Sequence, residues 1–218
     1  MRCSDYFQLF ERMFILVIGL VFALILLFLP HVLGRSQTAM LVQYEILERR
    51  FQLKRSAFSS KWGSGIGERF SLSGAYGGYP VSLYDHYHES KSGKTLWTSL
   101  SLEMLFAGEL EILLEATDGD EQARFDRKEE FVKTESPIAS YVIYSDSQAI
   151  GDRLLNESLR SRLEEFQGKG SFRLSKGFFE YRESGRILED ATRIRFQSAL
   201  MILAELGDSV AELNRPLT

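Results

Sequence analysis

The segment whose residue types come nearest to a metal site is Asp85-His86-Tyr87-His88. Side chains of a β-strand alternate between its two faces, so His86 and His88 would point the same way and could both reach one ion. A complete site needs a third ligand, and Asp85 would face the opposite side of the strand. His86 and His88 are therefore metal candidates that lack a third ligand, and a pair of surface histidines beside a hairpin is the simpler interpretation.

Two glycine-containing segments resemble phosphate-binding loops but lie in the wrong context. Gly93-Lys94-Thr95 matches the end of a P-loop, but His88 occupies the position five residues before Gly93 where such a loop needs a glycine. Gly63-x-Gly65-x-Gly67 has the glycine content of a nucleotide loop, but a predicted helix precedes it and predicted strands follow it. A dinucleotide site requires the reverse order. We therefore predict a solvated turn and a loop, and no cofactor.

The sequence carries no recognisable catalytic motif. Asp118, Asp120 and Glu121 form an acidic segment, but the central glycine and late glutamate of an EF-hand are missing. Neither a Gly-x-Ser-x-Gly elbow nor a His-Glu-x-x-His zinc motif occurs, and the only cysteine is Cys3. A catalytic pair of carboxylates stays open, because spacing along the chain does not reveal proximity in the fold. We therefore predict no catalytic residues.

The charge balance excludes one class of partner. The chain has 26 Lys and Arg against 30 Asp and Glu, a net charge of −4. Proteins that bind nucleic acid through its phosphates usually carry a basic field. We therefore expect no nucleic-acid partner.

An apolar segment near the N-terminus predicts a membrane anchor. Fourteen of the seventeen residues from Phe14 to Pro30 are Leu, Ile, Val or Phe, and residues 13–34 carry no formal charge. Such residues favour insertion by about 4 to 8 kcal/mol in total. We predict a short leader over 1–12 and a transmembrane helix over 13–34, with Phe14, Leu20, Leu26 and Leu33 in the lipid bilayer.

Two alternatives to an anchor were weighed. A cleaved signal peptide has a basic leader and a small-x-small cleavage site, and a core helix has a polar stripe; this segment has none of these features clearly.

Basic residues after the segment, such as Arg35, Arg49 and Arg50, slightly outnumber those before it. By the positive-inside rule, we expect a single-pass membrane protein with a cytoplasmic C-terminal domain.

The elements that must position any site follow the anchor. A 3.6-residue period through Leu41, Tyr44, Leu47 and Phe51 predicts a stalk helix over 35–58, strongest over 38–57. An α+β domain is then predicted over 59–218, with a mixed antiparallel sheet, a central helix over 147–167 and a long C-terminal helix from Asp190. The predicted strands cover about 68–74, 81–88, 95–104, 110–113, 139–145, 172–174 and 178–181.

Two motifs of this chain resemble a known family. They are Phe70-x-Leu72-x-Gly74-x-Tyr76-x-Gly78-x-Pro80-Val81 and Tyr141-Val142-Ile143-Tyr144-Ser145-Asp146. Both resemble a bacterial family of uncharacterised membrane proteins with N-terminal spanning segments and a C-terminal domain of unknown function. The resemblance implies location in a bacterial inner membrane, and it implies no catalytic residues.

The motifs also have physical interpretations of their own. Gly74 and Gly78 bracket Tyr76 where a strand bends or turns. Asp146, after Tyr144, can cap a following helix. These five residues are therefore predicted to serve the fold.

A clear anchor and a patterned core without a chemical constellation favour a membrane-anchored binding or interaction module. One alternative is a membrane-tethered hydrolase that uses carboxylates or a His86/His88 metal site. Another is a structural subunit of a membrane homo-oligomer, assembled through the anchor and the apolar seam of the C-terminal helix. The expected partners are the lipid bilayer and either another protein or further copies of this chain.

Overall fold

The computed structural model describes residues 3–58, 69–90, 93–104, 112–116, 132–134, 138–145, 155–175 and 177–213. The chain divides into two compact units, Met1–Leu41 and Val42–Thr218. Helix α1, Cys3–Phe51, begins in the first unit, and its last turns belong to the second.

The first unit exposes apolar side chains. The side chains described between Phe14 and Leu24 are apolar residues and a glycine, and Phe14 and Leu20 are 58% and 64% exposed. The side chains of Leu26 and Leu33 lie outside the described residues. Over the part of the chain that the structure describes, none of the helices is both long enough and apolar enough to span a membrane.

Helix α1 ends at Phe51, where its C-terminus is capped by the backbone. Gln52 has a φ of +55°, and the Leu53 amide donates to the Glu48 carbonyl at 3.0 Å. A left-handed residue followed by a bond to the carbonyl five residues back is the Schellman arrangement that stops a helix. Residues 54–58 then form a strand, so the helix predicted over 38–57 is wrong after Phe51. The predicted stripe of Tyr44, Leu47 and Phe51 is buried.

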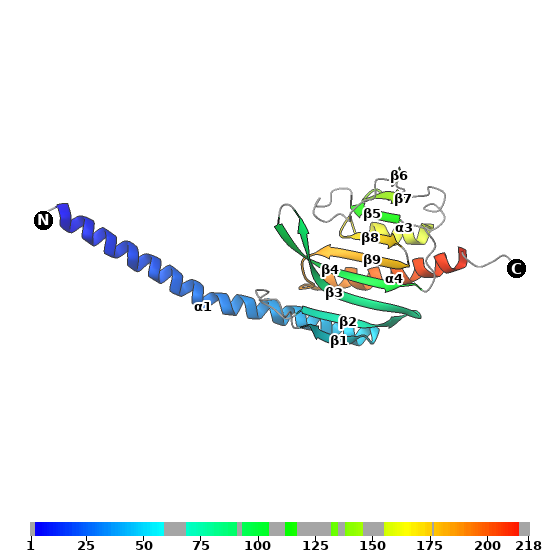
Figure 1. Ribbon diagram of the computed structural model, residues 1–218, viewed down its shortest axis with the longest axis horizontal. Coiled ribbons are helices and arrows are strands. Elements are labelled where there is room, and N and C mark those ends of the chain that lie inside the picture. The colour runs from blue at the N-terminus through cyan, green and yellow to red at the C-terminus, as the bar shows by residue number, and fades with distance from the viewer. Residues whose placement is uncertain are drawn as a thin grey trace. The chain divides into compact units, whose positions relative to one another are not determined.

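The nine strands that the structure describes form one antiparallel sheet in the order β1-β2-β3-β4-β9-β8-β5-β7-β6 (Figure 1). Their bounds are β1 Lys54–Phe58, β2 Arg69–Tyr76, β3 Tyr79–Ser90, β4 Gly93–Glu103, β5 Ile112–Ala116, β6 Val132–Thr134, β7 Tyr141–Ser145, β8 Ser171–Ser175 and β9 Phe178–Ser184. Helices α3, Glu157–Glu164, and α4, Asp190–Leu213, complete the described elements of this unit. The predicted α+β class is confirmed.

Glycines with positive φ form the tight turn between strands β2 and β3. Gly77 and Gly78 have φ angles of +60° and +88° between Tyr76 and Tyr79, which pair across the β2–β3 hairpin. Two consecutive residues with positive φ form the type I′ turn that matches the twist of a hairpin. The β8–β9 hairpin, predicted from residues 172–181, pairs Ser175 with Phe178.

All the described helical segments of the second unit pack on one face of the sheet, which we call the inner face. Tyr44 of α1 bonds to Asp85 of β3, Phe196 of α4 stacks on Tyr181 of β9, and Phe166, just after α3, stacks on Phe172 of β8. In Figure 1, α4 runs behind β3, β4 and β9. The buried apolar residues of this face include Leu72, Val81, Leu83, Leu100, Leu102, Ile112, Leu114, Phe172, Leu174, Phe179 and Tyr181.

The two later helices agree with the sequence to different extents. The predicted seam of α4 is buried at Phe196, Ala199, Leu203, Leu206 and Val210. Helix α3 is shorter than the helix predicted over 147–167, of which residues 147–154 are outside the described residues. Its cap is Asn156, whose side chain accepts a hydrogen bond from the Leu159 amide at 2.9 Å.

Candidate functional site

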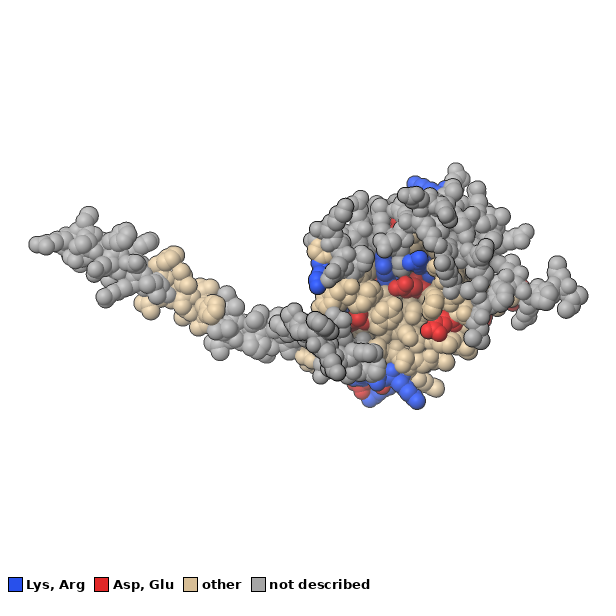
Figure 2. Space-filling view, viewed as in Figure 1, with Lys and Arg blue, Asp and Glu red and all other residues tan. Residues whose placement is uncertain are grey.

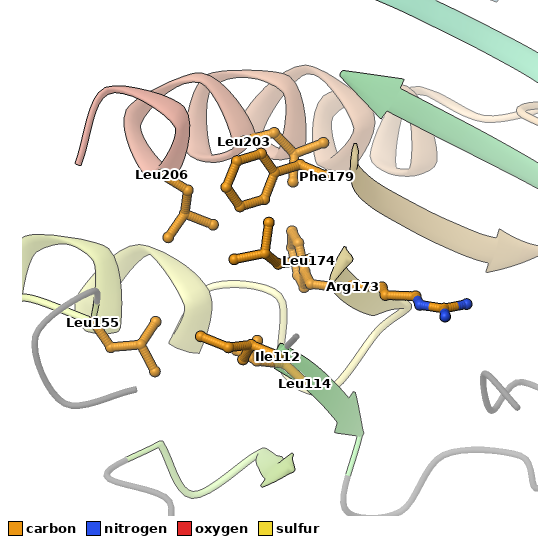
Figure 3. A pocket seen from close by; sticks show the side chains of 9 residues that line it. Ile112, Leu114, Leu155, Arg173, Leu174, Phe179, Leu203 and Leu206 are labelled. Atoms are coloured by element: carbon orange, nitrogen blue, oxygen red, sulfur yellow. The ribbon is translucent and has the colours of Figure 1, made fainter. Parts of the chain in front are cut away.

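An apolar pocket lies on the inner face between α4 and strands β5, β8 and β9 (Figure 3). The space inside it is about 20 Å³, room for about one water molecule. The side chains of Leu203, Leu206, Leu174 and Phe179 converge in it, whereas the guanidinium of Arg173 points away. The remaining lining residues are Ile112, Leu114, Leu155 and Phe172. This lining can make apolar contacts but directs no polar group inward that could perform chemistry.

A row of polar residues crosses strands β3, β4 and β9 on the inner face. Asp85 of β3 pairs in register with Thr98 of β4, and Thr98 pairs with Glu183 of β9. All three residues are buried. Two buried carboxylates flanking a hydroxyl are the arrangement that the sequence left open, so their partners decide what they can do.

Asp85 is bound by groups from three other elements. The Tyr44 hydroxyl donates to Asp85 Oδ1 at 2.7 Å, and Thr98 Oγ1 lies 2.8 Å from both Asp85 Oδ1 and the Gly185 carbonyl oxygen. Arg186 Nε lies 3.6 Å from Asp85 Oδ2, which has no hydrogen-bond partner among the described residues. The carboxylate therefore ties α1 to the sheet through one oxygen.

Burial dominates the electrostatics around Asp85. It raises the pKa of Asp85, and the hydrogen bonds from Tyr44 and Thr98 and the charge of Arg186 oppose it only in part. Burial and then the charge of Asp85 raise the pKa of Tyr44 well above its ordinary value. A hydroxyl has one proton, so Thr98 can donate either to Asp85 or to Gly185. A protonated Asp85 would donate to Thr98 and leave the Thr98 proton for Gly185.

Glu183 has a complete set of partners. Arg195 of α4 donates to both of its oxygens, with Nε and Nη2 each at 2.7 Å, and the Tyr181 hydroxyl donates to Oε1. Burial and then the charge of Glu183 raise the pKa values of Tyr181 and Tyr141. Glu183 and one oxygen of Asp85 thus spend their hydrogen bonds on α1, α4 and the sheet, as a structural network does.

The opposite face of the sheet, which we call the outer face, carries different residues. None of the described helical segments of the second unit packs on it. In one row across the strands, Ser71, Tyr84, Ser99, Arg182 and Ser171 are paired in register. The row on one side holds Ser73, Ser82, Ser101, Glu180 and Arg173, and the row on the other holds His86, Trp97 and Ser184.

Polar contacts connect the centre of the outer face. The Ser99 hydroxyl donates to Glu180 Oε1 at 2.8 Å, and the Arg182 guanidinium lies 4.8 Å from the centre of the Trp97 ring. Burial and then the charge of Glu180 raise the pKa of Tyr84. Figure 2 looks onto this face and shows uncharged residues across its middle, with acidic and basic residues side by side at their edge.

The structure locates the predicted metal candidates only in part. His86 lies on the outer face beside Tyr84, with ring centres 5.5 Å apart, and the side chain of His88 lies outside the described residues. Asp85 faces the inner side, as strand alternation predicted. Within the described residues, no group of three or more His, Cys, Asp or Glu could hold a metal ion.

The other loop candidates have different outcomes. Gly93 and Lys94 begin β4 at the hairpin, where no helix follows as a P-loop would need. The segment Gly63–Gly67 and the acidic residues Asp118, Asp120 and Glu121 lie outside the described residues.

Two residues of the first motif serve the junction between α1 and the sheet, and a third forms a turn. A Cβ on Gly74 would lie 2.8 Å from Leu53 Cδ2 and 3.3 Å from Leu53 Cα, so glycine permits this close approach. Tyr76 packs edge-on against Phe51 with ring centres 5.2 Å apart, and Gly78 forms the hairpin turn. Tyr144 pairs with Leu113 in the sheet, and Asp146 lies outside the described residues.

Comparisons with known proteins identify a fold. No protein-family model matches this chain, and no curated protein matches it in sequence. Among solved structures, the crystal structure of the mycobacterial trehalose monomycolate transport factor A, TtfA, aligns with a TM-score of 0.52. The sequences are 13% identical over 85% of this chain and 98% of that chain. At this identity the alignment shows a shared fold.

Proposed function

We propose that this protein is a membrane-tethered accessory factor in lipid transport, and that it acts by binding rather than by catalysing a reaction. The observation that carries the proposal is the fold shared with TtfA, a transport factor for trehalose monomycolate, over 98% of that chain. Fold alone does not specify function. Three features of the chain itself agree with the proposal.

The first feature is the N-terminal segment. Residues 13–34 are uncharged, and the described side chains from Phe14 to Leu24 are apolar or glycine and exposed. Exposed contiguous apolar surface of this kind is costly in water and favourable in lipid. It supports a tether to the lipid bilayer. The basic residues that follow the segment favour the cytoplasmic side of a bacterial inner membrane for the second unit.

The second feature is the use of the buried carboxylates. Asp85 and Glu183 bind α1 and α4 to the sheet, as described above, and the pocket of Figure 3 is lined by apolar groups. Carboxylates engaged in structural contacts and a pocket lining without inward polar groups agree with a domain that binds rather than cleaves.

The third feature is the resemblance of the two sequence motifs to a family of bacterial membrane proteins. Two residues of the first motif, Gly74 and Tyr76, lie where the end of α1 meets the sheet. A helix that enters the domain through a tightly packed junction is suited to hold that domain close to its anchor.

Lipid delivery in the native host tests the proposal. Deletion of the gene should slow the transfer of a radiolabelled, newly made glycolipid out of the inner membrane, and the full chain should restore it. A chain that starts at residue 35 should not restore it, because it lacks the proposed tether. Residues 35–218 behind an unrelated transmembrane helix are the matched control and should restore it.

Unchanged glycolipid transfer in the deletion strain would contradict the proposal. Full restoration by the anchorless chain would contradict the tether alone. Recovery of the full chain in the soluble fraction after alkaline carbonate extraction would do the same.

A further inference from the structure

Asp85 lies where the last turns of α1 rest on the sheet, and its carboxyl group is closed off from solvent. Its side chain is 0% exposed. The Tyr44 hydroxyl of α1 donates to Asp85 Oδ1 at 2.7 Å, and Tyr44 is itself fully buried. Both residues belong to the second unit. If these turns of α1 left the sheet, Asp85 would therefore lose a direct cover and meet water.

The Thr98 hydroxyl beside Asp85 has more acceptors than protons. Thr98 Oγ1 lies 2.8 Å from Asp85 Oδ1 and 2.8 Å from the Gly185 carbonyl oxygen. A hydroxyl has one proton, so both short contacts are hydrogen bonds only if Asp85 supplies a proton of its own. The geometry is that of a neutral carboxyl group that donates to Thr98 while Thr98 donates to Gly185.

The other oxygen of the carboxyl group gives a second indication. Asp85 Oδ2 has no hydrogen-bond partner among the described residues, and Arg186 Nε, 3.6 Å away, has none either. A buried carboxylate anion needs hydrogen bonds to its oxygens, as Glu183 receives on both from Arg195. An oxygen without a partner costs less on a neutral carboxyl group than on an anion.

We propose that Asp85 is a proton-dependent latch for α1: with its proton it holds residues 42–51 on the sheet, and loss of the proton loosens them. Helix α1 is continuous from Cys3 to Phe51, so the helix that carries the exposed apolar segment also ends in the latch. The inference concerns how this helix is held, and it does not depend on the proposed role in transport.

The titratable and charged groups that act on Asp85 come from three places. They are Tyr44 of α1, Arg186 after β9 and His86 of the same strand. Burial raises the pKa of Asp85, and the hydrogen bonds from Tyr44 and Thr98 and the charges of Arg186 and His86 lower it only in part. The pKa of Tyr44 is raised well above its ordinary value, so its hydroxyl stays a donor.

The sign of the effect follows from burial. If α1 left the sheet, water would reach Asp85 and reduce the largest contribution to its raised pKa. The docked form therefore binds the proton more tightly than the loosened form. Docking of residues 42–51 is strongest below the ordinary pKa of an aspartate and weakens as pH rises through the raised pKa.

Hydrogen exchange measured by mass spectrometry tests the latch on the natural full chain in detergent micelles. The end of a helix without tertiary contacts is marginal in water, so the amides of residues 42–51 should exchange when these turns leave the sheet. Protection factors are the chemical exchange rates at each pH divided by the observed rates. The protection of residues 42–51 should fall about threefold or more between pH 5 and pH 8. It should stay below that of residues 196–206 of α4 throughout.

Asp85→Asn should remove this pH dependence, because its side chain cannot ionise and its amide can still donate to Thr98. Asp208→Asn is the matched control. Asp208 also accepts a tyrosine hydroxyl, from Tyr79 at 2.9 Å, but it is exposed and lies in α4. This variant should keep the pH dependence of the natural chain.

Four results would overturn the latch. One is constant protection of residues 42–51 between pH 5 and pH 8. Another is protection equal to that of α4, since α1 would then leave the sheet only when the whole unit unfolds. The third is a pH dependence that persists in Asp85→Asn, which would assign it to another group such as His86. The last is a pH dependence that Asp208→Asn also removes. The first two results come from the natural chain, so they decide the question if Asp85→Asn fails to fold.

Discussion

The two faces of one sheet differ in what fills them. On the inner face, Phe172 lies among the rings of Tyr141, Phe166 and Tyr181, with centres 6.0, 5.3 and 4.6 Å away. On the outer face, serines alternate with longer side chains such as Tyr84 and Arg182 in one row across the strands. Side chains alternate along every strand, so both faces come from the same segments. The inner face therefore holds the ring cluster and the packed helices, whereas the outer face of the described strands carries more polar side chains.

Removal of an inner-face ring should have the largest effect on this comparison. Phe172→Ala should lower the free energy of unfolding by about 3 to 5 kcal/mol, because it leaves a cavity among packed rings. Tyr84→Ala on the outer face should cost less than about 2 kcal/mol, since Tyr84 is only half-buried. Denaturant titration of both full-length variants measures the difference. Equal losses would show that the outer face is packed like a core.

Breaking the Glu183–Arg195 pair should have the next largest effect. Arg195→Ala leaves a buried carboxylate without its two guanidinium bonds and should cost about 2 to 4 kcal/mol. The double variant Glu183→Gln/Arg195→Ala should regain part of this loss, because the uncompensated charge is gone. Thermal unfolding of the natural chain, both single variants and the double variant gives the coupling. Purely additive losses would show that the pair is not coupled.

Asp85 should make stability depend on pH. Its pKa is raised in the folded state, so the folded chain holds its proton more tightly than the unfolded chain does. Stability is then lost as pH rises from about 4 through the raised pKa. Asp85→Asn removes this loss, so its melting temperature relative to the natural chain should increase with pH over that window. A constant difference between pH 4 and pH 8 would contradict the raised pKa.

The smallest effect is expected on the outer face itself. Ser82→Val should change the free energy of unfolding by no more than about 0.5 kcal/mol, towards greater stability. Leu83→Ala, at the next position of the same strand, should cost about 2 to 5 kcal/mol because Leu83 is buried on the inner face. Denaturation midpoints of the two variants compare the faces directly. A loss of several kcal/mol for Ser82→Val would indicate that the serines are structural.

The sequence predicted those parts of the fold that local patterns encode. The seam of α4 and the buried stripe of α1 follow a helical period, and the hairpin at Gly77 and Gly78 follows from residues that accept positive φ. The sequence did not predict strand β1. The helical pattern gave no sign that α1 would end at Gln52, because Gln52 is not a glycine. The cap of α3 at Asn156 was missed for a similar reason, since several polar residues nearby could have served.

The polar clusters on both faces of the sheet were hidden from the sequence because their residues meet only in the sheet. Ser82 and Ser101 are neighbours through the register of β3 and β4, and Glu180 joins them from β9. Scattered serines have no spacing that identifies them as a group. The sequence singled out His86 as a metal candidate. In the structure, His86 lies beside Tyr84 and pairs in register with Trp97.

The sequence by itself determined the class of the fold and the positions of most strands, because both depend on hydrophobicity and period along continuous segments. The anchor over 13–34 stays a prediction of the same kind. Tertiary structure alone decided which polar residues became partners. Tyr44 reaches Asp85 across 41 positions, and Glu180 receives the Ser99 hydroxyl across 81. Antiparallel pairing brings distant strands into register, and the alternation of side chains then sends one residue into the core and the next to the open face.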